Sequence, residues 1–392
     1  MNLIEQYTRY FTTVEEPQTA FCPYRICPLG AHSDHQHGKV TGLAIDKGIN
    51  IVYTPTDDGS VEMVSLNFDG GIQFNVNNVP EQKVCDWADY LRGATVALSK
   101  IRPLSRGIKG IIHGSLPIGG LSSSAAVIIA FITALCKVNG ICLTADEIIK
   151  TAFWSEVNYV GVNVGTLDQS CEVLCQKDHL LYLDTSDGSY ERIAKSSLMK
   201  PFKIAIFFSG IERSLAGSAF NTRVDELKTA AFSLMSFAGL ECKSVADARL
   251  RYVPREVYDT YKDRLPENCR KRAEHYFTEY ARVEAGADAW RNGDIETFGR
   301  LSFESGYSSI YNYETGSPEL KELYEIMCRT KGIYGGRFSG AGFKGCCMAL
   351  VDPNYLEEIE AAVTKEYLKA FPNLEGKFSV HFCDSADGVM LR

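Results

Sequence analysis

The sequence predicts an α+β protein with two domains, and two observations lead to this prediction. The chain has 392 residues, which is more than one ordinary hydrophobic core supports, so two domains are expected. Strand-like segments precede helical ones in the first half, and strands and helices follow again after Pro201. Runs of strands followed by runs of helices favour an α+β fold over a doubly wound sheet. We therefore expect domains at residues 1–200 and 201–392.

The strands are recognised by short β-branched or apolar segments, and the helices by longer apolar patterns. A turn at residues 56–59 separates the first two clear strand patterns. Asp146 and Glu147 lie in the first turn of one helical pattern, where acidic side chains favour a helix start. We expect strands at residues 48–54, 61–66, 110–114, 202–209, 346–351 and 378–382, and helices at residues 86–100, 122–139 and 144–159.

Composition and charge narrow the class of protein. The apolar fraction of 45% and the charged fraction of 23% are typical of a soluble globular chain. A net charge of −8 argues against nucleic-acid binding, which depends on clustered Lys and Arg. The longest apolar run, residues 125–136, is too short to span a bilayer, and the first residues lack a signal-peptide pattern. We expect a soluble protein with no nucleic-acid or membrane partner, either a monomer or a homodimer.

The cysteines indicate a reducing compartment. There are thirteen, an odd number, and none form a CxxC pair, unlike the disulfide framework of a secreted protein. A cytoplasmic location is therefore expected. Cys171 and Cys175 lie one helical turn apart and could share a metal ion, but buried packing is the favoured interpretation.

The densest group of polar side chains lies on a loop at residues 23–38. Pro and Gly residues punctuate this segment, which follows a short strand, and three of the seven histidines of the chain fall within it. So much charge is costly to bury without partners, so the segment is a solvated loop, a binding site or a metal site. Its polar residues are Arg25, His32, Asp34, His35 and His37.

Two glycine-rich turns are candidate anion sites. In the first, Gly119 and Gly120 allow close backbone approach, and Ser122–Ser124 offer a cap and free N–H groups at the start of a helix. The second turn, residues 335–345, can form a nest of backbone amides. The alternatives are a simple serine-capped helix and a tight turn between strands. Neither a GxxxxGK[ST] loop nor a GxGxxG turn after a first strand is present.

These three segments, in this order, resemble the three motifs of the GHMP small-molecule kinases, and within that superfamily the galactokinase branch. The segment Gly161–Ser170 resembles the family element that carries a catalytic aspartate, and the stretch at Trp87 resembles the one near the nucleotide base. The resemblance runs from about Phe21 to Val351, which is most of the chain. It implies a two-lobed α+β fold of mixed sheets and helices, with the active site in the cleft between the lobes.

The resemblance also implies an ATP-dependent, Mg²⁺-using sugar 1-kinase that phosphorylates the anomeric hydroxyl of a galactose-configured sugar. The alternatives are an ordinary galactokinase and a catalytically inactive family member that only senses sugar and ATP. The implied site residues are Asp168 and Arg25 for catalysis; His32, Asp34, Gly165 and Ala31 for the sugar; Gly119, Gly120, Leu121, Ser122, Ser123, Ser124 and Trp87 for ATP; Gly340, Ala341 and Gly342 in the late glycine-rich motif; and Ser124 for the metal.

Three positions depart from the family pattern. Ala31 stands where typical galactokinases carry a glutamate that contacts the far hydroxyl of the sugar. Because a carboxylate there would repel a C6 carboxylate, its loss favours galacturonate over galactose. Ile128 is matched to the family glutamate that helps to hold magnesium, so that ligand is expected to be absent. Phe220 is matched to a sugar-lobe tyrosine, which removes one hydroxyl contact.

Overall fold

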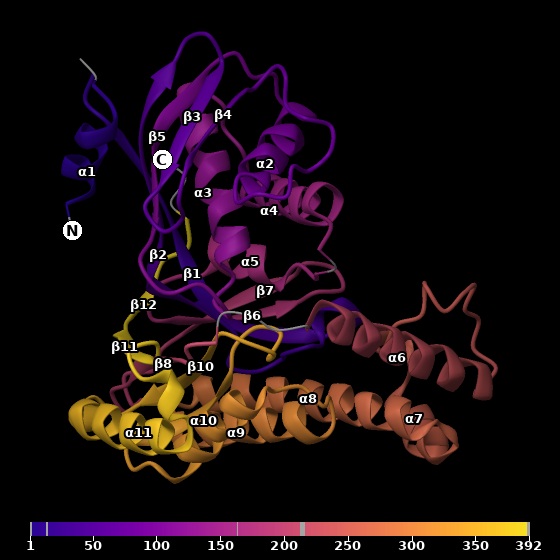
Figure 1. The fold of residues 1–392 in the computed structure, drawn as a ribbon. Helices are drawn as coiled ribbons and strands as arrows, with labels where there is room; N and C mark the ends of the chain where they lie inside the picture. The colour runs from indigo at the N-terminus through magenta and orange to yellow at the C-terminus, as the bar shows by residue number, and fades with distance from the viewer. Residues whose placement is uncertain (1, 13–14, 163, 212–215, 390–392) are drawn as a thin grey trace.

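The chain folds into two lobes, each built on its own β-sheet (Figure 1). The computed structural model describes residues 2–12, 15–162, 164–211 and 216–389, with the side chains of residues 216–220 excluded. Within these residues the N-terminal lobe has an eight-stranded sheet and the C-terminal lobe a four-stranded one. The α+β class predicted from the order of segments is the one observed.

The larger sheet has the strand order β4-β3-β5-β2-β6-β7, with β1 and β12 both paired to the long strand β2. Most neighbours are antiparallel, while β3 and β5 run parallel. Its strands are β1 (Gln18–Ile26), β2 (Lys39–Thr56), β3 (Ser60–Ser65), β4 (Gly71–Asn75), β5 (Gly107–Gly114), β6 (His179–Asp184), β7 (Tyr190–Ala194) and β12 (Ser385–Ala386).

Helix α3 (Ser123–Val138) forms the centre of the N-terminal lobe. Its side chains are apolar on almost every face, as expected of a helix buried on all sides, and most of them belong to the main core. Helix α4 (Ala145–Trp154) starts at a capping box between Thr144 and Glu147. The remaining helices are α1 (Leu3–Tyr10), α2 (Asp89–Ser99), the π-helix η2 (Ser155–Val160) and α5 (Leu167–Leu174).

In the C-terminal lobe a layer of helices packs against the smaller sheet, whose order is β11-β8-β10-β9 (Figure 1). Its strands are β8 (Lys203–Phe208), β9 (Ile333–Phe338), β10 (Cys346–Val351) and β11 (Ser379–Cys383). Its α-helices are α6 (Ala216–Phe237), α7 (Arg255–Tyr261), α8 (Glu267–Arg291), α9 (Ile295–Tyr311), α10 (Pro318–Arg329) and α11 (Leu356–Ala370). Short 3₁₀ turns are η1 (Asp34–Gln36), η3 (Leu250–Tyr252), η4 (Lys262–Arg264), η5 (Pro353–Tyr355) and η6 (Pro372–Leu374).

The predicted elements are present, with three differences. The helix expected over residues 86–100 begins at Asp89, and the strand at 48–54 is the second half of the longer β2. The helix expected over residues 144–159 changes into the π-helix η2 at Ser155, an irregularity that often marks a functional site. Among the described residues, no helix is both long and apolar enough to cross a bilayer.

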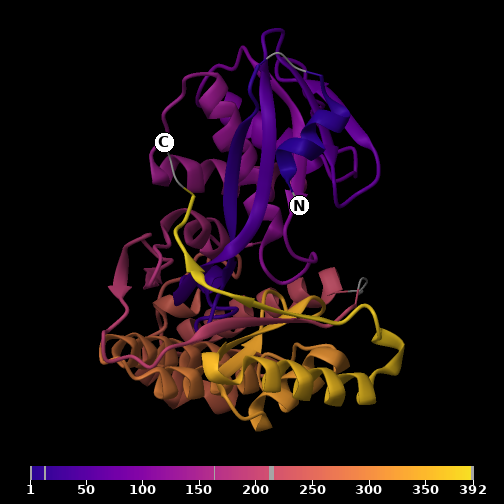
Figure 2. The same ribbon diagram turned by 90° about the vertical axis from the view of Figure 1, so that its left-hand side faces the viewer.

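The end of the chain does not stay in the C-terminal lobe. After β11 the chain crosses back, and β12 pairs with β2 of the large sheet (Figure 2). The domain boundary near residue 200 stays a prediction, and residues 385–386 belong by their pairing to the sheet of the first lobe.

Candidate active site

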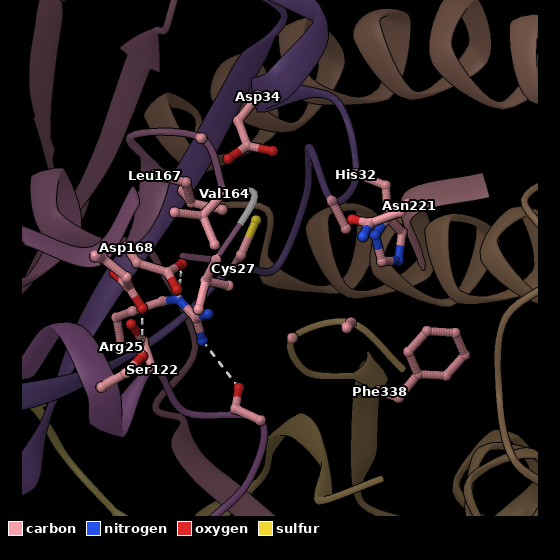
Figure 3. Close-up of a pocket in the computed structure, with 18 of the residues that line it drawn as sticks. Arg25, Cys27, His32, Asp34, Ser122, Val164, Leu167, Asp168, Asn221 and Phe338 are labelled. Atoms are coloured by element: carbon pink, nitrogen blue, oxygen red, sulfur yellow. Dashed lines mark hydrogen bonds and ion pairs between the residues drawn. The ribbon is translucent and has the colours of Figure 1, made fainter. Parts of the chain in front are cut away.

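A cavity of about 540 Å³ lies between the two lobes, and both lobes contribute to its walls (Figure 3). The N-terminal lobe supplies the loop after β1, the start of α3, the π-helix η2 and the start of α5. The C-terminal lobe supplies Asn221 of α6 and the end of β9 with the glycine-rich turn that follows it. The three segments singled out in the sequence therefore meet at one place.

Arg25 and Asp168 form an ion pair in the wall of this cavity. Nε of Arg25, on β1, lies 2.7 Å from Oδ1 of Asp168, in the first turn of α5, and the Arg25 Nη1 group donates to the carbonyl of Gly120 at 2.9 Å. Burial alone would lower the pKa of Arg25, but the carboxylate of Asp168 outweighs it and keeps the pKa above its ordinary value. A fixed cation therefore sits beside an acceptor carboxylate.

The two glycine-rich turns pack directly on each other. A Cβ on Gly119 would lie 2.9 Å from Cα of Gly345, and a Cβ on Gly120 would lie 3.0 Å from the carbonyl oxygen of Ser339. Both Gly119 and Gly120 also have positive φ, which favours glycine. The close approach places the start of α3 and the second turn on opposite sides of the same opening, where free backbone N–H groups attract an anion.

The predicted serine cap of α3 takes a different form. Ser122 is the N-cap residue, but its φ of 62° is left-handed and its side chain makes no capping hydrogen bond. A capping side chain needs an extended backbone, so here the hydroxyl cannot reach the first helical N–H groups. These backbone donors remain available to a ligand.

Ser124 contacts a carboxylate that the sequence analysis missed. Its hydroxyl donates to Oε1 of Glu156 at 2.6 Å, and the amide of Gln169 donates to Oε2 of Glu156 at 2.7 Å. Burial raises the pKa of Glu156 to about 7, and the negative charge of Asp168 adds to this. No local pattern marks Glu156, because it lies at the end of a helical segment where an acid is usually solvated.

The structure has no carboxylate at position 128, and the expectation that a metal ligand is therefore absent stays a prediction. Ile128 is fully buried in the main core, as an apolar face of α3 requires. Glu156, carried by η2, stands beside Ser124 instead, so the pocket does contain a hydroxyl–carboxylate pair. Together with Asp168 these are oxygen donors of the kind that Mg²⁺ prefers.

The sugar-motif loop brings Asp34 against Gly165. A Cβ on Gly165 would lie 2.1 Å from Oδ2 of Asp34, so the carboxylate can approach this backbone only because residue 165 is glycine. Burial raises the pKa of Asp34 to about 6, and the charge of Asp168 contributes. His32 stacks on the ring of Tyr313 with 4.2 Å between centroids, and burial lowers its pKa, so the imidazole is neutral.

Helix α8 holds this loop from the other lobe. Oε1 of Glu279 accepts from the backbone N–H of Gly30 at 2.7 Å, and Nε2 of His275 lies 2.9 Å from the carbonyl of Ala31. Glu279 also accepts from Ser305, and Ser305 in turn bonds to the buried Arg337. None of these three side chains was predicted as a site residue. His275 and Glu279 lie in a helix far along the chain, and Arg337 lies in the segment 335–345, where only the glycines were considered.

Arg337 and Asn221 line the cavity on the C-terminal side. The guanidinium of Arg337 is buried, donates to the carbonyl of Phe338 at 3.0 Å and to Ser309 at 3.0 Å, and lies 3.7 Å from Glu279. In the view of Figure 3, Asn221 and His32 overlap, on the other side of the picture from Arg25 and Asp168. A buried cation, paired with Glu279, and an amide thus belong to the lining of the cavity.

Some of the residues implied by resemblance lie elsewhere. Trp87 precedes α2 and packs, partly buried, against the main core rather than lining the described cavity. Leu121 is buried, and Gly342 packs on the ring of Phe338, whereas Gly340 and Ala341 line the cavity. The side chain of Phe220 falls outside the described residues.

The metal-site interpretation of the histidine-rich loop is not supported. In the described part of the chain, no group of three or more His, Cys, Asp or Glu side chains is placed to hold a metal ion. His37 instead lies 2.8 Å from the hydroxyl of Tyr252, and His35 lies 3.3 Å from that of Tyr313. Cys171 and Cys175 are buried and free, in agreement with a packing role.

Comparison with known proteins identifies the family. Residues 89–176 match the GHMP kinase N-terminal domain, and residues 287–370 match the GHMP kinase C-terminal domain. The chain is 39% identical to a galacturonokinase from Arabidopsis thaliana, covering 95% of the chain and 93% of that protein. It is 30% identical to a galactokinase from Roseiflexus sp. (strain RS-1), covering 94% of the chain and 91% of that protein.

The solved structures agree. Galactokinase from Lactococcus lactis, complexed with galactose, superposes with a TM-score of 0.89 at 27% identity, covering 99% of the chain and 98% of that structure. A mevalonate kinase from Methanococcus jannaschii shares the fold, with a TM-score of 0.66 at 17% identity, covering 96% of the chain and 100% of that structure. The chain belongs to the GHMP kinase family, as the sequence motifs predicted. Within that family it is a carbohydrate kinase of the galactokinase type.

Proposed function

We propose that this protein is an ATP-dependent, Mg²⁺-requiring sugar 1-kinase of the cytoplasm that prefers galacturonate to galactose. The observation that carries the catalytic assignment is the Arg25–Asp168 pair in the wall of the inter-lobe cavity. The cytoplasmic location is supported by thirteen cysteines that are all free.

The chemistry needs alignment and charge stabilisation rather than covalent work by the protein. The carboxylate of Asp168 accepts a hydrogen bond from the anomeric hydroxyl and takes its proton as that oxygen bonds to the γ-phosphorus. The bond from the γ-phosphorus to the oxygen that bridges to the β-phosphate breaks at the same time, and ADP leaves with that oxygen. The guanidinium of Arg25, held 2.7 Å from Asp168, fixes the position of the carboxylate and offsets negative charge on the phosphoryl oxygens.

The paired glycine-rich turns hold the phosphates of ATP. The N-terminus of α3, reached through Gly119 and Gly120, presents backbone N–H groups at the positive end of the helix dipole. Gly340 and Ala341 face them from the second turn. The backbone N–H donors of the phosphate site therefore come from both lobes. The site is complete only when the two glycine-rich turns are in contact.

The donor set fits a magnesium ion. Ser124, Glu156 and Asp168 would hold it, and the phosphates and water would supply its other ligands. When bound, the ion neutralises phosphate charge. Glu156 would bind the ion as a carboxylate, with Gln169 holding its second oxygen in place.

The preference for galacturonate rests on three residues that line the cavity, Ala31, Arg337 and Asn221. Ala31 presents no carboxylate there, and its carbonyl is tied to His275. Arg337 and Asn221 add a buried cation and an amide to the same cavity. A C6 carboxylate is therefore attracted rather than repelled, while Asp34 accepts hydrogen bonds from ring hydroxyls. The relative named galacturonokinase supports the same preference.

A coupled assay of ADP release over a panel of sugars with MgATP tests the proposal. We expect turnover with galacturonate at a higher kcat/KM than with galactose. Efficient use of galactose without galacturonate turnover would make the protein an ordinary galactokinase. Binding of both substrates by calorimetry without ADP release would instead indicate a sensor.

A further inference from the structure

The last described residues of the chain form a strap between the lobes. Strand β11 belongs to the C-terminal sheet, and the chain then crosses to the N-terminal lobe (Figure 2). There Ser385 pairs with Ile45 and Ala386 with Ala44, both in β2. We define residues 384–389 as the C-terminal strap.

The strap bonds to the end of helix α5. The backbone N–H of Gly388 donates to the carbonyl of Cys175, and that of Val389 donates to the carbonyl of Glu172, both at 2.7 Å. The last carbonyls of a helix have no partner within the helix, so they need one from outside. The strap supplies such a partner to Glu172 in the last turn of α5, and another to the C-cap residue Cys175.

The turn after α5 is tied to the same segment. A carboxylate oxygen of Asp387 accepts from the N–H of Lys177 at 2.9 Å, and the hydroxyl of Ser385 accepts from the N–H of Asp178 at 3.1 Å. Val389 is only 6% exposed and belongs to the main core, so the strap is anchored by apolar packing as well.

Gly388 marks the closest approach between strap and helix. A Cβ at this position would lie 2.5 Å from the carbonyl oxygen of Val173, a backbone atom that cannot rotate away. Any larger residue must therefore move the strap, the helix or both. The strap can therefore approach the helix this closely only with glycine at position 388.

The other end of α5 carries the catalytic groups. Asp168 pairs with Arg25, and the adjacent Gln169 holds Glu156. The helix has eight residues and a length of about 12 Å, so it moves as one short rigid rod. A shift at Glu172 and Cys175 is transmitted to both Asp168 and Gln169.

We propose that the C-terminal strap is a positioning element for catalysis, with Gly388 and Val389 as its key residues. It fixes α5 from its C-terminal end and so places Asp168 and, through Gln169, Glu156. The proposal rests on the catalytic role of Asp168 stated above. A misplacement of about 1 Å at a reacting group can cost on the order of 100-fold in rate, so the strap affects turnover without touching substrate.

Gly388→Val tests this in the full-length protein, with Gly388→Ala as the milder variant. We expect kcat with galacturonate and MgATP to fall about 10- to 100-fold, with less loss for alanine, while both KM values change less than about twofold. Hydrogen exchange of the α5 amides should become faster. The matched control is Gly71→Ala, where the added Cβ makes an ordinary 3.5 Å contact with the carbonyl of Met63; it should leave kcat unchanged.

A lowered melting temperature with kcat within twofold of the unmodified protein would overturn the proposal, because the strap would then be structural only. Unchanged exchange in α5 would also overturn it. If Gly388→Val does not fold, the pair Ser385→Ala and Asp387→Ala removes two side-chain acceptors without a clash and is judged by the same readouts. Near-normal turnover in Asp168→Asn would instead refute the catalytic assignment, and the exchange measurement would still judge the contact between strap and helix.

Discussion

Arg25 and Asp168 join β1 to α5 through a 2.7 Å contact between Nε and Oδ1. The side chain of Arg25 is 5% exposed and that of Asp168 is 21% exposed, so the carboxylate keeps one edge open to the cavity while the guanidinium is enclosed. This asymmetry suits a group that must accept a proton from a substrate beside a fixed cation.

Asp168→Asn should remove most of the activity while leaving the fold intact. The amide has the size of the carboxylate but cannot take a proton, and loss of a general base typically costs about 10²- to 10⁴-fold. The measurement is kcat from ADP release, with thermal unfolding to check the fold. Asp263→Asn, a change at an exposed turn, is the control and should have no effect. Near-normal turnover in Asp168→Asn would refute the assignment.

Glu156 predicts a pH-dependent requirement for magnesium. Its pKa is raised to about 7 by burial, so below that pH a proton competes with the metal ion. Apparent Mg²⁺ affinity should rise by about tenfold per pH unit up to neutrality and then level off. Titrations of activity against free Mg²⁺ at pH 6, 7 and 8 measure this.

Glu156→Gln should weaken the response to Mg²⁺ and flatten this pH dependence, since no proton is displaced. Any pH dependence of the apparent Mg²⁺ affinity that remains in Glu156→Gln arises from protonation of ATP itself. Glu304→Gln, which changes an exposed carboxylate paired with Arg300, is the control. An unaltered Mg²⁺ titration in Glu156→Gln would show that Glu156 is not a ligand.

Asp34 predicts an acidic limit to sugar binding. Burial and the nearby charge of Asp168 raise its pKa to about 6, and only the ionised carboxylate accepts from two hydroxyls. The kcat/KM for sugar should therefore fall as pH drops through 6. Asp34→Asn should lower it by about 10- to 150-fold, the equivalent of one charged hydrogen bond, and abolish the pH dependence. A loss confined to the KM for ATP would contradict this role.

Ala31→Glu should reverse the substrate preference. A carboxylate at this position repels the C6 carboxylate of galacturonate but accepts a hydrogen bond from the C6 hydroxyl of galactose. We expect kcat/KM to fall for galacturonate and to be retained or raised for galactose. Ala31→Gln is a control of equal size without the charge, and it separates repulsion from crowding. Equal losses in both variants would indicate crowding alone.

The sequence was sufficient where function depends on local backbone chemistry. The glycine pattern at Gly119 and Gly120 and the helix after it can be read directly, because turns and helix starts are specified by neighbouring residues. Asp168 was predicted only through the resemblance of residues 161–170 to a family motif. Even here the detail differed, since Ser122 adopts a left-handed backbone and does not cap the helix with its side chain.

Side chains brought in from distant segments could not be read in this way. Glu156 lies at the end of a helical pattern and looks like a surface acid, yet in the fold it is buried against Ser124. His275 and Glu279 lie far along the chain and reach the loop at Gly30 and Ala31 only because α8 packs under it.

By itself the sequence determined the family, the α+β class, the anion-binding turns and the pair of residues proposed for catalysis. Only the tertiary structure decided that Glu156 lies beside Ser124, that Arg337 and Asn221 line the cavity, and that residues 384–389 return to the end of α5. The physical reason is that local propensity acts over a few residues. Burial, close approach and charge pairing arise only when different segments of the chain, such as those that carry Glu172 and Val389, meet in the folded core.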